Sequence, residues 1–227
     1  MSVSPELKAN FNECLVTAVA KPQSVSRRAS GLPVLGQRLL ALLGLVALCP
    51  LFLLLVIAIR LESKGAIIYS QIRVGGNGRR FQFYKFRSMY TKDDPRYTEP
   101  QVTESDREGV CKKYKKDPRI TRVGSVIRKL SLDELPQLFN VLKGDMLLVG
   151  PRPALCCETD FYDEKAMRRL AVEAGMTGLW QVSGRADTTF EEQIDLDIEY
   201  IEKRSWLFDL KILVATIPAM LLAKGAY

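Results

Sequence analysis

The longest apolar run in the chain covers residues 39–59, which contain no charged side chain. At the rise of an α-helix these 21 residues extend about 30 Å, close to the thickness of the hydrocarbon core of a bilayer. Pro50 lies near the middle of the run, where it has no amide hydrogen to donate to the carbonyl of Val46 and kinks a helix. The pattern therefore predicts a kinked membrane helix over residues 39–60.

Basic residues flank this run on both sides. Four of them and no acid lie between residues 21 and 38, and residues 60–92 hold eight of them with one acid, Glu62. Because basic side chains next to a membrane segment favour the cytoplasm, both ends favour the same side of the membrane. A re-entrant helix satisfies this condition, while a bent spanning helix stays open, since membrane helices tolerate proline. Residues 1–38 are expected to form a flexible basic N-terminal segment.

The rest of the chain, residues 61–227, has the pattern of one compact domain of the α+β class, mostly helical. A small β-hairpin is expected over residues 65–89, where two runs rich in aromatic and β-branched residues flank a glycine-rich turn. Helical spacing of apolar residues follows at 123–130, 135–142 and 190–201.

The last of these helices has a recognisable start. Thr188 with Glu191 three residues later has the spacing of a capping box. The apolar segment 206–223 contains Pro218 and predicts either an amphipathic helix in the plane of a membrane interface or a core helix.

The charge balance favours anionic partners. The net charge is +7 and the sequence pI is about 9.2, which suits a phosphorylated substrate, an anionic membrane or a nucleic acid. Nucleic-acid binding is not expected, because it leaves the apolar segment without a role. The chain has no histidine, which excludes catalysis by a Ser-His-Asp triad or a Cys-His pair.

Two adjacent acids, Asp133 and Glu134, are the first candidates for chemistry. Pro136 follows them, and proline is tolerated in the first turn of a helix, so both acids are expected at a helix N-terminus. The free amides there stabilise negative charge, which predicts that Asp133 stays ionised and that a Mg²⁺ ion could bind between the two acids and a diphosphate. The alternative is that they only cap the helix, as acids at helix starts often do.

Three further stretches present cations or glycines. Lys85 and Arg87 are spaced to share one face of a strand, where they could bind a diphosphate or only line a solvated edge. Arg152 lies between two prolines that fix its backbone, which favours either anion binding or an incidental rigid turn. The glycine-rich stretch 175–185, which ends in Arg185, could surround a nucleotide or form an ordinary loop.

In this order along the chain, these stretches resemble the monotopic phosphoglycosyl transferases, also called bacterial sugar transferases, of the type that primes exopolysaccharide and O-antigen synthesis. The resemblance covers about residues 36–227. It rests on KFRSM at 85–89, DPRITRVG at 117–124, LSLDELPQLFNVLKGDM at 130–146, LVGPRP at 148–153, GMTGLWQVSGR at 175–185 and KGAY at 224–227.

The resemblance implies a two-step transfer. Asp133 matches the nucleophile, which would attack the β-phosphate of a UDP-sugar, expel UMP and hold the phosphosugar until a polyprenyl phosphate, typically undecaprenyl phosphate, accepts it. Glu134 matches the second acid of the dyad, implicated in binding Mg²⁺ or handling a proton. The basic motif positions expected near the substrate phosphates or nucleotide are Lys85, Arg87, Arg119, Arg152 and Arg185.

The resemblance also implies a place in the cell. It indicates a re-entrant helix broken at a Ser-Pro pair, here Cys49-Pro50, in the bacterial inner membrane, with residues 61–227 forming the catalytic domain on the cytoplasmic face. Downstream glycosyltransferases are conceivable partners. No pattern indicates an oligomeric state or selects among galactose, glucose and N-acetylated amino sugars. The competing hypotheses are a membrane-associated phosphohydrolase and a non-catalytic scaffold that binds anionic lipid.

Overall fold

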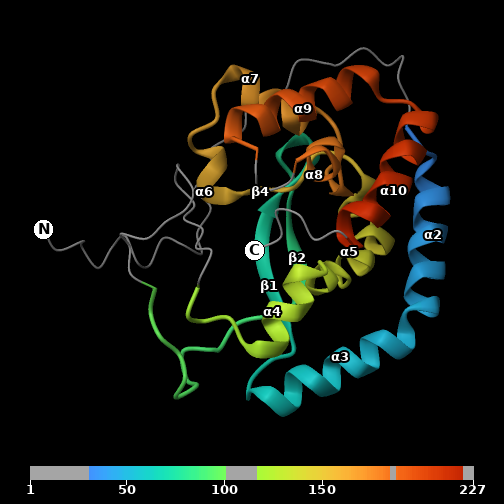
Figure 1. The fold of residues 1–227 in the computed structure, drawn as a ribbon. Coiled ribbons are helices and arrows are strands. Elements are labelled where there is room, and N and C mark those ends of the chain that lie inside the picture. The colour runs from blue at the N-terminus through green and yellow to red at the C-terminus, as the bar shows by residue number, and fades with distance from the viewer. Residues whose placement is uncertain (1–30, 101–116, 185–187, 222–227) are drawn as a thin grey trace, which may run out of the picture.

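The computed structural model describes residues 31–100, 117–184 and 188–221. Its longer helices and strands form a mostly helical α+β fold, as the sequence predicts (Figure 1). The helices are α2 (Val34–Ala47), α3 (Cys49–Glu62), α4 (Arg122–Lys129), α5 (Gln137–Lys143), α6 (Cys156–Thr159), α7 (Glu164–Met167), α8 (Leu179–Ser183), α9 (Phe190–Lys203) and α10 (Trp206–Leu221). The strands are β1 (Ile68–Val74), β2 (Arg80–Phe86), β3 (Leu147–Val149), β4 (Ala154–Leu155) and β5 (Gly175–Thr177), and 3₁₀ turns lie at η1 (Gly76–Gly78), η3 (Leu132–Glu134) and η4 (Arg168–Ala171).

The apolar run folds as two helices, α2 and α3, whose axes differ by 61° (Figure 1). The break lies at Leu48, and Pro50 occupies the first turn of α3, where its missing amide costs no helical hydrogen bond. The predicted kink is therefore confirmed. Within the described residues, no single helix is long and apolar enough to cross a membrane, and this bent pair alone has the length and composition to do so.

The first helix starts earlier than predicted. Residues 34–38, assigned from the sequence to the flexible segment, form the first turn of α2. The reason is Gln37, which is fully buried: its side-chain amide donates to the carbonyl of Leu32, and its Oε1 accepts from the amides of Leu148 and Val149. A polar side chain at helical spacing thus fastens α2 to β3.

The predicted hairpin is present and forms most of a three-stranded sheet. β1 pairs with β2 in antiparallel register, from Ile68 opposite Phe86 to Val74 opposite Arg80. The chain turns through η1, where Asn77 has a φ of 55°. On the other edge of β1, Ala154 of β4 pairs with Val74, which brings the segment after Arg152 against the hairpin.

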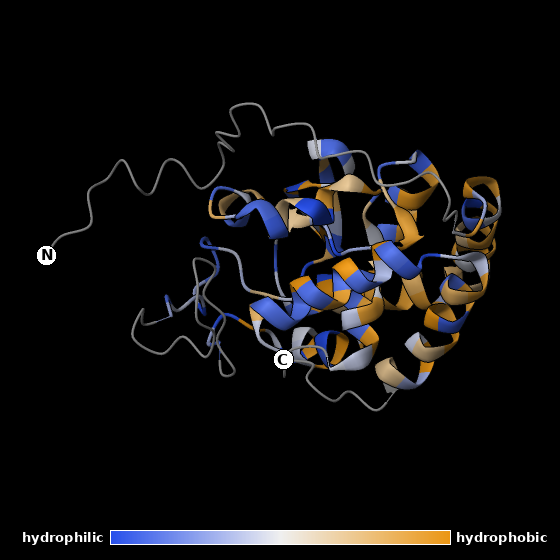
Figure 2. Cartoon of the chain, turned by 90° about the horizontal axis from the view of Figure 1, so that it is seen from above, coloured by the Kyte–Doolittle hydropathy of each residue, from blue (hydrophilic) through white to orange (hydrophobic). Residues whose placement is uncertain are grey.

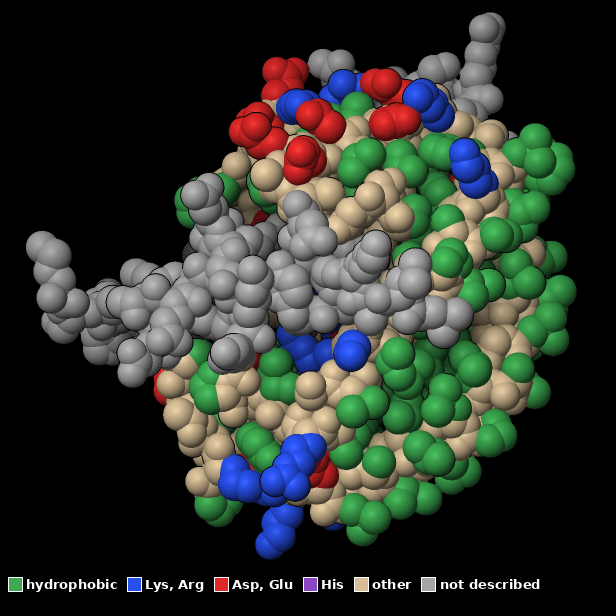
Figure 3. Space-filling model, viewed as in Figure 1, with side chains coloured by type: hydrophobic (Ala, Val, Ile, Leu, Met, Phe, Trp, Pro, Cys, Tyr) green, Lys and Arg blue, Asp and Glu red, His purple; other side chains and the backbone are tan. Residues whose placement is uncertain are grey.

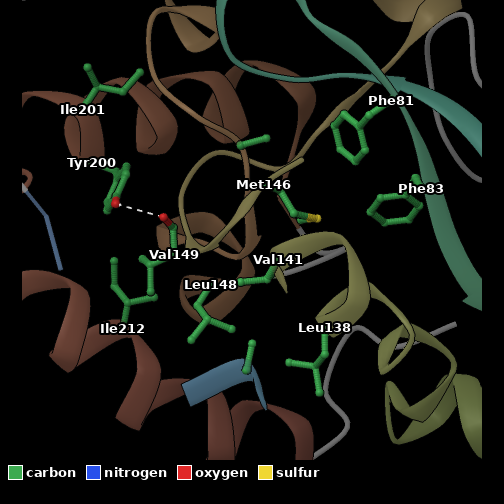
Figure 4. Packing of buried hydrophobic residues seen from close by; sticks show 12 residues of the cluster. Phe81, Phe83, Leu138, Val141, Met146, Leu148, Val149, Tyr200, Ile201 and Ile212 are labelled. Carbon is green, nitrogen blue, oxygen red and sulfur yellow. Dashed lines mark hydrogen bonds between the residues drawn. The ribbon is translucent and has the colours of Figure 1, made fainter. Parts of the chain in front are cut away.

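The main hydrophobic core lies between this sheet and the helices α2, α5, α9 and α10 (Figure 4). Phe81 and Phe83 alternate into it from β2, and Val149 enters it from β3, which pairs in parallel with β5. Tyr200 of α9 is fully buried, and its hydroxyl donates to Asp209 of α10. The core therefore joins the hairpin strand β2 to the helices α2, α5, α9 and α10.

The helix α9 starts with a capping box one residue later than predicted. Thr189 accepts from the amide of Glu192, and Glu192 accepts from the amide of Thr189. The sequence contains two adjacent threonines followed by two adjacent glutamates, so the spacing alone fits either pair. The structure uses the second pair, Thr189 and Glu192.

Hydrophobic side chains cover much of the surface formed by α2, α3 and α10 (Figure 3). Figure 2 shows the same concentration from above, on the side that α2 and α10 occupy in Figure 1. The exposed large apolar residues of these helices are Val34, Leu35, Leu39, Leu40, Leu42, Leu43, Val46, Leu53, Leu54, Ile57, Leu61, Trp206, Leu207, Leu210, Val214 and Ile217. Charged residues of both signs gather instead over α7 and α9 (Figure 3).

Candidate active site

The turn η3 carries the two adjacent acids. Ser131 precedes it in a left-handed conformation, with a φ of 54°, and reverses the chain after α4. Leu132 and Leu135 pack into an apolar cluster with Phe86 and residues of α3, so the two acids lie between anchored neighbours. The acids were expected at a helix N-terminus. They lie in a 3₁₀ turn directly before α5. Leu135 and Pro136, which join the turn to the helix, both have right-handed helical backbone angles, so the acids lie close to the predicted place.

Glu134 is bound by two cations. Its Oε1 lies 2.6 Å from the Nζ of Lys85 and 2.7 Å from the Nη2 of Arg152, whose Nη1 lies 3.3 Å from Oε2. Burial raises the pKa of this carboxyl, but the two cations outweigh burial and hold it well below its usual range. Glu134 therefore stays ionised and fixes the positions of both cations.

Asp133 lies in a different environment, although it is the adjacent residue. It is 7% exposed, and its Oδ2 lies 3.6 Å from Lys85 Nζ. Burial raises the pKa of Asp133; the Lys85 ammonium opposes this rise, and the Glu134 carboxylate adds to it. The pKa thus shifts opposite to the direction expected from helix amides, because burial outweighs the opposing charges of Lys85, Arg128 and Arg152.

Lys85 and Arg152 reach the acids from separate elements. Lys85 follows Phe81 and Phe83 on the inner face of β2, and its Nζ lies 5.6 Å from the centre of the Phe83 ring. Arg152 lies between two buried prolines, immediately before β4. The structure thus brings together four of the predicted site residues: Lys85, Asp133, Glu134 and Arg152.

Arg87 does not join them. It is 6% exposed, and its guanidinium donates to the carbonyls of Ser63 and Lys64 at 2.7 and 2.9 Å and to the Ser63 hydroxyl at 2.9 Å. β2 ends at Phe86, so Arg87 passes beyond the sheet to the end of α3. The predicted pairing of Lys85 and Arg87 around one diphosphate is not what the side chains show.

Two other predicted residues lie elsewhere. Arg119 binds Asp117 through two nitrogens, at 2.6 and 2.9 Å, so its guanidinium is engaged by a neighbouring carboxylate two residues away. Arg185 lies outside the described residues. The prediction that it contacts the nucleotide therefore remains a prediction.

The end of α3 is joined to the catalytic side of the fold by further contacts. The Glu62 carboxylate accepts from the amides of Arg122 and Val123, at 2.7 and 2.9 Å, at the start of α4. Arg96 donates to the carbonyl of Glu62 at 2.9 Å. Together with Arg87, these bonds connect the bent helix pair to α4, the helix that leads into the acidic turn.

Comparison with known proteins assigns the chain to a family. The model of the bacterial sugar transferases matches residues 33–223. The chain belongs to that family. It is 44% identical to the exopolysaccharide production protein ExoY of Sinorhizobium fredii over 194 residues, covering 83% of this chain and 85% of the relative.

Two longer relatives of this sugar transferase carry more specific names. The galactosyl transferase CpsE of Streptococcus agalactiae is 46% identical over 82% of this chain and 41% of its own length. The undecaprenyl-phosphate galactose phosphotransferase of Salmonella typhimurium is 44% identical over 73% of this chain and 36% of its own length.

Sequence reasoning missed Arg73, Arg128 and Gln37 of this sugar transferase. Arg73 lies on β1 in the hairpin, and the alternation of a strand places it on the same face as Gln71, the partner of Phe83. The alternation along the strand could therefore have predicted that Arg73 lies on the same face of β1 as Gln71. Gln37 carried no comparable signal, because its partners on β3 are more than a hundred residues away.

The acids fit a Mg²⁺ ion only if a substrate completes its coordination. Among the described residues, no group of three or more Asp, Glu, His or Cys gathers to hold a metal. Mg²⁺ is commonly held by one or two carboxylates together with substrate phosphates. Asp133 and Glu134 supply two hard oxygen donors of that kind, so they would hold the ion jointly with a diphosphate.

Proposed function

We propose that this sugar transferase moves a sugar phosphate from a UDP-sugar to a polyprenyl phosphate through a covalent intermediate on Asp133. The observation that carries the proposal is a buried Asp133 beside Lys85, which with Arg152 is bound by the adjacent Glu134. The names of the relatives agree with it: one is an undecaprenyl-phosphate galactose phosphotransferase, and another is the UDP-glucose:undecaprenyl-phosphate glucose-1-phosphate transferase of Xanthomonas campestris.

In the first step, an oxygen of the ionised Asp133 carboxylate attacks the β-phosphorus of the UDP-sugar. The bond from that phosphorus to the bridging oxygen breaks, and UMP leaves with the electron pair. In the second step, a phosphate oxygen of the polyprenyl phosphate attacks the same phosphorus and displaces Asp133. The product is a sugar linked to the lipid through a diphosphate, and the enzyme returns to its starting form.

The cations support both steps by binding charge on phosphate oxygens. Glu134 holds Lys85 and Arg152 in place before any substrate arrives, so little reorganisation is needed when an anion binds. Lys85 also opposes protonation of Asp133, which must be ionised to attack. A Mg²⁺ ion bound by Asp133 and Glu134 would supply further neutralisation of diphosphate charge.

We further propose that the bent pair α2–α3 enters one leaflet of the bacterial inner membrane from the cytoplasmic side. The exposed apolar side chains of these helices have no partner in the described part of the chain that would bury them, and lipid would do so. The basic residues on both flanks support a cytoplasmic location of both ends. A polyprenyl phosphate in the same leaflet could then reach the catalytic domain.

The experiment is UMP release from a panel of UDP-sugars by the purified full chain, with and without polyprenyl phosphate. We expect UMP and a lipid-linked sugar diphosphate from at least one UDP-sugar. The Asp133→Asn variant should be inactive but folded, while Asp195→Asn, which changes an exposed ion pair with Lys165, should retain full activity. Release of inorganic phosphate in place of UMP would indicate a phosphohydrolase, and no turnover of any donor would favour a lipid-binding scaffold.

A further inference from the structure

Arg73 lies at the centre of the sheet beside the acidic site. It pairs with Phe81 on β2 and with Leu155 on β4, so its strand has neighbours on both edges. Its guanidinium carbon lies 5.1 Å from the centre of the Phe83 ring, the same ring that lies under Lys85. The Phe83 ring thus contacts both Arg73 and Lys85, and Lys85 binds Glu134.

The segment that contains Arg152 also approaches Arg73. The Nη1 of Arg73 donates to the carbonyl of Pro153 at 3.2 Å, the residue directly after Arg152. The two guanidinium groups are close enough for their charges to repel. After burial, this repulsion is the second cause that lowers the pKa of Arg73, to about 10, and the carboxylates of Glu158 and Glu134 oppose it with a smaller effect.

Arg73 lacks the partner that a buried cation normally has. No ion pair joins it to an acid within the described ranges, and its Nε is buried without a hydrogen-bond partner there. Arg169 shows the contrast: it is more deeply buried, at 6% exposed, and its Nε donates to Asp197 at 2.7 Å. A half-buried, unpaired cation next to a second cation is unfavourable unless an anion joins the two.

We propose that Arg73 binds a phosphate group of the substrate together with Arg152. This inference rests on the proposed function, because the anion it assigns to Arg73 is a phosphate of the UDP-sugar or of the polyprenyl phosphate. The planar guanidinium can give two parallel hydrogen bonds to phosphate oxygens, and the Phe83 ring behind it restrains its orientation. Phosphate binding would compensate the repulsion that the free site contains.

A purely structural role makes the opposite prediction about stability. If Arg73 served only to stack on Phe83 and to hold Pro153, its removal would lower the melting temperature. If Arg73 waits for an anion, replacing it with a neutral side chain of similar length removes a repulsion from the free enzyme. The melting temperature without ligand should then stay the same or rise, while ligand binding weakens.

The test compares the full chain in detergent or nanodiscs with its Arg73→Met variant. Affinity for UDP is measured by the ligand-induced rise in melting temperature and by titration. We expect UDP affinity to fall about tenfold or more, the usual effect of losing hydrogen bonds to a charged group. The matched control is Arg168→Met, which removes an exposed arginine paired with Glu202 and should leave UDP affinity unchanged.

A second arm identifies which phosphate is bound. Weaker UDP affinity assigns Arg73 to the donor, and a raised KM for polyprenyl phosphate with unchanged UDP affinity assigns it to the acceptor. Unchanged values for both in a folded Arg73→Met enzyme would overturn the inference. A melting temperature well below the wild type in both Arg73→Met and Arg73→Gln, which keeps a donor for the Pro153 carbonyl, would indicate the purely structural role and overturn the inference. Failure of the proposed function is separate: it is a wild-type enzyme that releases no UMP.

Discussion

Two neighbouring carboxylates in this site have opposite environments. Glu134 accepts from Lys85 and Arg152, whereas Asp133 is buried with only a longer contact to Lys85. The pKa of Glu134 is accordingly lowered and that of Asp133 is raised. A pair whose pKa values are pushed apart in this way can divide its roles: Glu134 holds the two cations, and the ionisation of Asp133 depends on the charges around it.

Removing the charge of Lys85 or of Glu134 should therefore move the acidic limb of the pH–rate profile in opposite directions. The nucleophile must be ionised, so activity falls as the pH drops through the pKa of Asp133. Lys85→Met removes a charge that lowers this pKa and should move the limb of kcat/KM to higher pH. Glu134→Gln removes a charge that raises it and should move the limb to lower pH.

Lys165→Met, which changes an exposed ion pair, is the control and should leave the limb in place. Movement of the limb in the same direction in Lys85→Met and Glu134→Gln, or in neither, would show that Asp133 does not determine it. Both variants are expected to be slower than the wild type, so the comparison concerns the position of the limb and not the height of the profile.

At the scale of elements, Arg87 connects β2 to the end of α3, which the sequence motif did not predict. Arg87 was expected to bind a diphosphate, but its donors are used on the end of α3. The helix pair is thereby linked to the segment that leads into the acidic turn. We infer that Arg87 positions the α2–α3 pair relative to the site.

Arg87→Met should lower the melting temperature by several degrees, because the Ser63 hydroxyl and two carbonyls lose their donor, at a cost of about 1–3 kcal/mol. Arg96→Met is the matched control, since Arg96 contacts the same helix end but is half exposed, and it should cost less. UDP affinity should change little in either variant. A phosphate-binding role for Arg87 would show the reverse, with a normal melting temperature and weak UDP binding.

The bend between α2 and α3 should determine topology. Pro50→Leu restores an amide donor for the carbonyl of Val46 and favours one continuous helix of about 40 Å, longer than a hydrocarbon core. In a chain whose five native cysteines are replaced, Leu32→Cys should resist an impermeant reagent in intact cells and react once the cells are opened.

With Pro50→Leu added, Leu32→Cys should react from outside, whereas Lys92→Cys, on the catalytic side, should stay protected in both backgrounds. Labelling of Leu32→Cys from outside in the chain that keeps Pro50 would contradict re-entry and make the segment an ordinary span.

The elements near the site could largely be predicted from local patterns. The hairpin, the kink at Pro50 and the turn that carries Asp133 each depend on residues within one short stretch. The partners of Arg87 and Gln37 could not be predicted, because α3 and β3 reach them only after the chain has packed. The capping box of α9 shows a smaller limit, since two spacings fit the sequence and only the folded helix distinguishes them.

At the scale of the whole molecule, one surface is apolar, and the end formed by α7 and α9 is charged, with acids and basic residues side by side and acids in excess along α9 (Figure 3). Acids repelled by anionic lipid and apolar side chains buried by acyl chains would orient the enzyme in the same sense. The surface of α10 extends the apolar face of α2, so α10 is expected to lie at the membrane interface.

A solvent-sensitive fluorophore attached to Leu210→Cys in nanodiscs tests this orientation. Leu210 is 46% exposed on α10, and we expect emission typical of an apolar environment there. Phe161→Cys is the matched control, because Phe161 is a 71% exposed apolar residue located beside α6. Its label should report water. Aqueous emission at both positions would place α10 away from the interface.

The central claim is that Asp133 forms a covalent bond to the phosphosugar. The most direct measurement is intact-protein and peptide mass spectrometry after mixing the full chain with its UDP-sugar in the absence of polyprenyl phosphate. The account predicts release of up to one equivalent of UMP and a sugar-phosphate adduct on the peptide that contains Asp133, absent from Asp133→Asn and discharged by adding polyprenyl phosphate. Turnover that needs the acceptor before any UMP appears, with no adduct at any time, would contradict it.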